Sequence, residues 1–119
     1  MIPKITGDEF IKACESNDLE TVTMHLHEHA DYVNANGDSG LSWAAVRGNL
    51  EIVNLLMSAS HLNINLVSKN LTSPLTLAAS MGHTDIVKQL MTCKTLNVNH
   101  VDQHGYSALL WAFQKNNWT

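Results

Sequence analysis

The sequence feature that most constrains the fold is an internal repeat with a fixed period. The segment Ser73–His83 recurs 34 residues later as Ser107–Asn117, and Trp43–Asn49 falls in the same frame. The equivalent alanines at this step are Ala44, Ala78 and Ala112. A period of this length is typical of solenoids, in which similar supersecondary units stack side by side. The repeat therefore predicts a stack of similar units.

A fourth and less regular copy precedes these three. Ala13–Asp18 lies 31 residues before the second copy, and the same step separates Val22 from Val53. An asparagine follows a valine by twelve residues in three copies, in the pairs Val22 and Asn34, Val53 and Asn65, and Val87 and Asn99. On this register the second copy is three residues shorter than the third between its asparagine and its alanine. We therefore expect a trimmed hairpin or first helical turn around residues 37–40.

Each copy has the pattern of two short helices followed by a loop that projects as a hairpin. Ser73 before Pro74 predicts a helix start, because serine accepts hydrogen bonds from unpaired amides and proline has no amide hydrogen to leave unpaired. Thr6–Glu9 resembles a capping box. The first helices should end at residues that tolerate a left-handed backbone, namely Asn17, Gly48, Gly82 and Asn116. Apolar residues of the second helices recur at helical spacing and predict a shared core.

The motifs of the third and fourth copies carry a family resemblance. Ser73–Ala79 with Gly82–His83 closely matches the T-P-L-H-x-A-A signature of the ankyrin repeat, and Leu96–Asn99 with Asp102–Gly105 resembles that family's V-N-x-x-D-x-x-G hairpin. The resemblance implies an all-α fold, an ankyrin-repeat solenoid of about three and a half stacked helix-turn-helix repeats with projecting hairpin loops. We expect a single domain over residues 1–119, with repeats at about 8–35, 36–66, 67–100 and 101–119. The last repeat is incomplete, so either its aromatic residues fold back as a cap or the chain is cut from a longer array.

The resemblance also implies a function, which is protein–protein interaction. In ankyrin proteins the hairpin tips and the exposed part of the first helices line a concave surface that binds partners. Carried over position by position, this surface consists of Asp38, Val46, Arg47, Lys69, Asn70, Thr72, Ser80, Met81, Gln103, His104, Tyr106, Gln114 and Lys115, extended by Glu15 and Ser16. Arginine, methionine and tyrosine in this set suit an interface, because they combine directional donors with adaptable or aromatic contacts. The column Trp43, Leu77 and Trp111 is interpreted as framework packing between repeats.

Candidate catalytic and metal-binding residues are few. Gly40–Ala44 lacks the second glycine of a nucleophile elbow, and Cys14 falls in a core column of the repeat. His25 and His29 share one face of a helix, but zinc needs further ligands, so an exposed polar helix face is favoured over a metal site. His83 is expected to bond to backbone. We therefore expect no enzyme activity and no cofactor.

Composition narrows the class of partner. The chain carries a net charge of −4 with 15% charged residues, which provides no basic field for nucleic acid. It has no signal-peptide pattern and no apolar stretch of membrane-spanning length, so we expect a soluble, cytoplasmic monomer with reduced cysteines. The leading hypothesis is a protein-binding module. The alternative is the non-catalytic ankyrin portion of a larger multidomain enzyme or effector.

Overall fold

The computed structural model describes residues 3–69, 72–97, 100–101, 107 and 110. The described residues form three helix pairs. The helices are α1 (Gly7–Glu15), α2 (Leu19–His29), α3 (Gly40–Arg47), α4 (Leu50–Met57), α5 (Pro74–Ser80) and α6 (Thr84–Leu90). They have 7 to 11 residues each, which is too short for stability in isolation, so the stability of each pair depends on its neighbours.

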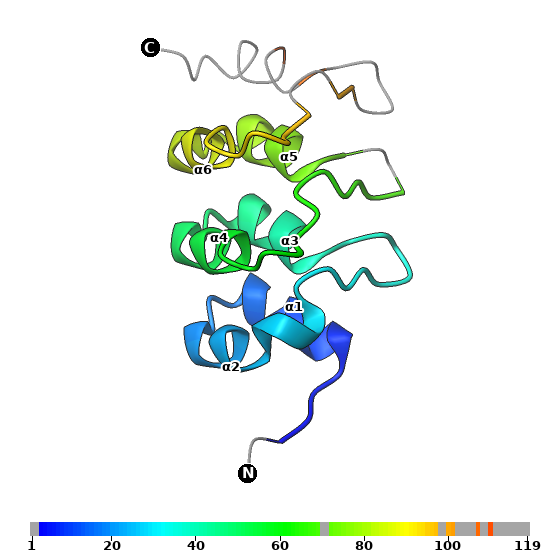
Figure 1. The fold of residues 1–119 in the computed structure, drawn as a ribbon. Coiled ribbons are helices and arrows are strands. Elements are labelled where there is room, and N and C mark those ends of the chain that lie inside the picture. The colour runs from blue at the N-terminus through cyan, green and yellow to red at the C-terminus, as the bar shows by residue number, and fades with distance from the viewer. Residues whose placement is uncertain (1–2, 70–71, 98–99, 102–106, 108–109, 111–119) are drawn as a thin grey trace.

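The helices form two layers. The first helices α1, α3 and α5 contact one another in sequence, and the second helices α2, α4 and α6 form a parallel layer beside them, with loops projecting on the opposite side of the first helices (Figure 1). An antiparallel bridge between Val33 and Ser39 closes one of these loops, and a bridge between Val101 and Ser107 closes another. The all-α stack of helix pairs predicted from the repeat is therefore confirmed.

The first helices begin where their capping residues predict. The Thr6 side chain accepts from the Glu9 amide while the Glu9 carboxylate accepts from the Thr6 amide, so the capping box is complete. Ser39 and Ser73 accept in the same way from the amides three residues later, at 3.1 Å each. These serines are buried, because each lies where a hairpin enters the stack.

The first helices also end as predicted. Asn17, Gly48 and Gly82 have φ angles of 64°, 75° and 78°, the left-handed conformation that terminates a helix with little cost for glycine or asparagine. A β-carbon on Gly48 would lie 2.7 Å from the His83 ring of the next repeat. Glycine at this position therefore serves the turn and the contact between repeats. Asn116 lies outside the described residues.

The core runs between the two layers through all three pairs. Ala44 and Ala78 have no exposed surface, and Ile52 and Ile86 are equally buried in the second helices. Small alanines allow the paired helices to approach closely, and the larger residues fill the space between repeats. Ala112, the third member of the alanine column, lies outside the described residues.

The expected trimming of the second hairpin or first helical turn is wrong. The Asn34 amide donates to the Asp38 carbonyl, and the Ser68 amide donates to the Thr72 carbonyl, so the two hairpins have the same length. The three-residue difference lies earlier, between the second helix and the hairpin: this loop is short after α2 and long after α4. The asparagine register was misleading, because Asn65 lies in the long loop rather than in a hairpin.

Asparagine and aspartate side chains bind these loops to one another. Asp31 accepts from the Asn63 amide at 2.7 Å, and Asn65 accepts from the Asn97 amide at 2.7 Å. The Asn65 amide group also donates to the Thr95 carbonyl. Each bond joins one repeat to the next, so the loops between second helices and hairpins add polar contacts to the apolar stacking.

Candidate functional site

Arg47 is held in place at the end of the first helix of its repeat. It is the last residue of α3, and its guanidinium carbon lies 5.7 Å from the centroid of the Trp43 ring, one helical turn earlier. Its Nη2 donates to the Glu15 carboxylate of the preceding repeat at 2.6 Å. The Arg47 side chain is still 53% exposed and that of Glu15 is 32% exposed. This arrangement orients the guanidinium while leaving donors open to solvent.

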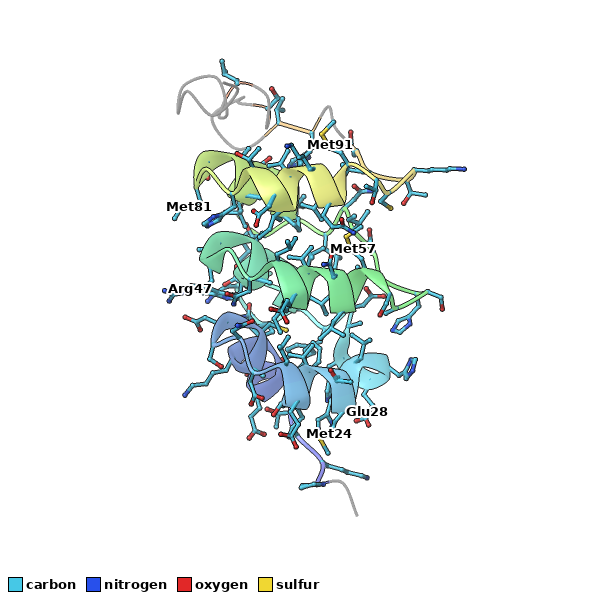
Figure 2. The ribbon with its side chains drawn as sticks, turned by 90° about the vertical axis from the view of Figure 1, so that its left-hand side faces the viewer. Met24, Glu28, Arg47, Met57, Met81 and Met91 are labelled. Carbon is cyan, nitrogen blue, oxygen red and sulfur yellow. The ribbon has the colours of Figure 1, made fainter. Side chains whose placement is uncertain are left out.

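Met81 occupies the position equivalent to Arg47 in the next repeat, 34 residues later. It is 54% exposed, and the two side chains lie one above the other at the same edge of the stack (Figure 2). We call Glu15, Trp43, Arg47 and Met81 the first-helix surface. It combines an oriented cation with an exposed, flexible thioether, and such side chains are enriched at protein interfaces.

Three other predicted residues of the first helices are less available to a partner. Val46 is half-buried, and its carbonyl accepts a hydrogen bond from His83 Nε2 at 3.0 Å. The half-buried Ser80 donates its hydroxyl to the Leu77 carbonyl at 3.0 Å. Ser16 is exposed and lies at the N-terminal end of the same row. The first two contribute mainly to the framework.

The predicted hairpin residues lie at the projecting loops. Lys69 is exposed, and its amide donates to the Asn36 carbonyl of the preceding hairpin at 3.3 Å, which brings the two hairpins side by side. Asp38 is half-buried, and its backbone amide donates to the Asn34 side chain. Thr72 is half-buried, with its hydroxyl 2.6 Å from that of Ser68. The remaining predicted residues, Asn70, Gln103, His104, Tyr106, Gln114 and Lys115, lie outside the described residues.

The expected exposed histidine face on α2 is wrong. His25 is only 4% exposed and has non-helical φ and ψ angles of −117° and 16°, which kink the helix. His29 is also partly covered, and its Nε2 donates to the Ile5 carbonyl at 3.1 Å. His25 Nδ1 has no hydrogen-bond partner among the described residues. The step of 31 that aligns Val22 with Val53 also aligns His25 with the buried Leu56, so the repeat itself contained the signal.

The described residues contain little that resembles catalytic or metal-binding chemistry. Burial raises the pKa of the Cys14 thiol to about 12, which keeps it protonated and unreactive. Hydrogen bonds from the Thr95 hydroxyl and amide lower the pKa of the Cys93 thiol. Within the part of the chain that the structure describes, no three histidine, cysteine or carboxylate side chains are grouped to hold a metal ion. None of its helices is long and apolar enough to cross a bilayer.

Two residues of the site carry more than the sequence indicated. Trp43 was interpreted as framework packing, yet its half-buried ring also supports Arg47. The spacing of four residues on one helix could have indicated that contact. Asn49, at the position of His83, donates to the Cys14 and Glu15 carbonyls at 2.9 and 3.2 Å. It therefore fixes the helix end on which Glu15 lies.

The fold is thus a solenoid of helix pairs with projecting hairpins, which is one of the scaffold classes that present a surface rather than an enclosed site. A sequence model of ankyrin repeats in three copies matches residues 10–102 and, in a second overlapping match, residues 41–119. The chain belongs to the ankyrin repeat family. Repeats of this family are generally protein–protein interaction modules and are typically non-catalytic. No curated protein matches the chain.

Proposed function

We propose that this chain binds a partner protein through the first-helix surface and the neighbouring hairpins, without cofactor or reaction. The observation that carries the proposal is the fixed geometry of Arg47 between Trp43 and Glu15, with Met81 exposed one repeat further along. Binding loses less conformational entropy when an anchor side chain is already oriented. The framework around this surface is rigid, so specificity can be carried by a few side chains.

The partner is expected to offer an acceptor to Arg47 and an apolar side chain to Met81. Arg47 has five N–H donors, and Glu15 accepts from one nitrogen, so a carboxylate or a backbone carbonyl of the partner can accept from the rest. Lys69 at the hairpin and the predicted residues of the last repeat extend the proposed surface on either side.

The proposal is tested with matched substitutions on the two layers. Partners captured on the immobilised chain are identified by mass spectrometry, and the affinity of the most abundant one is measured for Arg47→Ala and Met81→Ala. The controls are Lys88→Ala and Met91→Ala on α6, since Met91 is 55% exposed, nearly as much as Met81 (Figure 2). Loss of an interface anchor costs about 1–2 kcal/mol, or about a tenfold weaker affinity.

The four variants should keep the helical content and melting temperature of the parent chain, because all four side chains are exposed. Binding that survives both first-helix substitutions, or that is lost equally with the α6 controls, contradicts the assignment of the surface.

A further inference from the structure

A second surface lies on the opposite layer of the stack. A groove of about 420 Å³ runs between α2 and α4, on the side that faces the viewer in Figure 2. It is lined by Leu19, Thr23, Glu51, Asn54, Leu55 and Ser58. None of these residues belongs to the first-helix surface, so the groove is a separate candidate for binding.

The groove has an apolar floor. Leu19 and Leu55 are half-buried and pack against the core from the two helices. The Thr23 hydroxyl donates to the Leu19 carbonyl at 2.7 Å, and the Ser58 hydroxyl donates to the Leu55 carbonyl at 2.5 Å. Both hydroxyls are therefore used within their own helices. The groups left to a ligand are the leucine side chains, the Asn54 amide and the Glu51 carboxylate.

The electrostatic field at this groove is negative. The helices that form it carry Glu20, Glu28 and Glu51 but no lysine or arginine. Among the described residues, Glu20 and Glu51 form no ion pair, and Glu28 lies 3.8 Å only from His29. Glu51 itself lines the groove and is exposed. A partner that brings cations would meet uncompensated carboxylates beside an apolar floor.

We propose that the groove between α2 and α4 binds a basic amphipathic helix of a second protein. One apolar side chain of that helix would lie between Leu19 and Leu55, and a lysine or arginine would pair with Glu51. The lining of α4 extends from Glu51 to Ser58, about 10 Å at 1.5 Å per residue, which matches two turns of a docked helix. Such packing uses the ordinary recognition of a helix by a groove between helices.

This inference adds a second interface to the proposed function. The first-helix surface and the groove lie on different layers, so the module would hold two partners at once and act as a bridge between them. The two proposals fail independently, because they rest on different residues.

The test uses the full chain and a synthetic 18-residue leucine–lysine peptide with helical amphipathic spacing. Affinity is measured by calorimetry, and the site is mapped by amide shifts of the 15N-labelled chain. The leucine–lysine peptide should bind and shift amides of α2 and α4, while the matched leucine–glutamate peptide should not bind. Glu51→Lys should weaken binding at least about fivefold, since it replaces an attraction with a repulsion.

Glu28→Lys is the matched control. It changes the net charge by the same amount, but Glu28 is absent from the groove lining and lies on the side of α2 away from α4 (Figure 2). It should weaken binding less than about twofold, the effect of the general field alone. Leu55→Ser tests the apolar floor with the charge unchanged and should weaken binding about fivefold by removing buried apolar surface.

Three outcomes would overturn the inference. They are the absence of saturable binding by the leucine–lysine peptide, an equal loss for Glu51→Lys and Glu28→Lys, and shifts confined to the first-helix surface. The last outcome would assign the basic peptide to the Arg47 and Met81 side of the stack instead.

Discussion

The outer helices of the first and second repeats, α2 and α4, occupy equivalent places in the stack but are built differently. Leu56 in α4 is fully buried and apolar, whereas the equivalent residue in α2 is His25, which is equally enclosed and lacks a partner for Nδ1. The third repeat resembles the second, with the buried Leu90 at this position. The stack therefore accepts an imidazole in its core, but only in its first described repeat.

The same contrast extends to the chain around His25. Helix α2 has 11 residues and a kink, and its loop to the hairpin is short, whereas α4 has 8 residues, no kink and a longer loop. His29, one turn after His25, bonds to Ile5 and packs against Phe10 with ring centroids 5.7 Å apart. The first repeat thus uses its own N-terminal segment for contacts that later repeats make with a neighbour.

The largest expected effect concerns thiol reactivity in the two regions. Because burial raises the pKa of Cys14 to about 12 and hydrogen bonds lower that of Cys93, the thiolate fraction at pH 8 should differ by at least about a thousandfold. A disulfide reagent should label Cys93 quickly in the native chain. Cys14 should react at the rate at which the first repeat opens, which the Cys93→Ser variant isolates.

Native-state labelling of Cys14 that approaches the rate of Cys93 would break the comparison, because it would mean that the first repeat is open much of the time. Labelling of Cys14 that coincides with global unfolding would show that the core with His25 opens only together with the rest of the stack.

A reciprocal exchange at the equivalent core positions gives the next largest effect. Leu56→His should lower the free energy of unfolding by about 2–4 kcal/mol, because it removes buried apolar surface and introduces a polar group without a partner. His25→Leu should raise it by about 1–2 kcal/mol, since an orphaned buried nitrogen is replaced by hydrocarbon. Urea denaturation followed by circular dichroism measures both.

The control for His25→Leu is His27→Leu on the exposed face of the same helix, which should change stability by less than about 0.5 kcal/mol. A destabilised His25→Leu variant would mean that the kink in α2 requires the imidazole. The two regions would then differ by design of the backbone rather than by the cost of a buried polar group.

The sequence predicted the parts of this fold that depend on local chemistry. The left-handed ends at Asn17 and Gly48 and the capping serines are set by a few neighbouring residues, and all are confirmed. The bond from His83 to backbone was also predicted and is confirmed. The failures concern equivalence between repeats: Asn34 and Asn65 resemble each other in sequence, but only Asn34 lies in a hairpin.

The candidate site was less accessible to sequence reasoning. The bond between Glu15 and Arg47 depends on how one repeat is rotated against the next, which no local pattern specifies. The pairing of i and i+4 histidines on α2 favoured a polar face, whereas the aligned position of Leu56 indicated a core. Burial decided the outcome, because the hydrophobic stripe of a stacked helix is set by its neighbours.

The smallest expected effect concerns Asp18 and Asn49, which share one position in consecutive repeats but bond differently. Asp18 caps its own helix by accepting from the Thr21 amide at 3.2 Å, whereas Asn49 donates across the interface to two carbonyls of α1. Asn49→Asp should lower the free energy of unfolding by about 1 kcal/mol or less, since the lost donor is partly offset by a new cap. Asp18→Asn should be close to neutral, because asparagine caps a helix about as well as aspartate does. If Asn49→Asp is as stable as the parent chain in urea, the bond across the interface adds nothing and apolar stacking alone holds the first two repeats together.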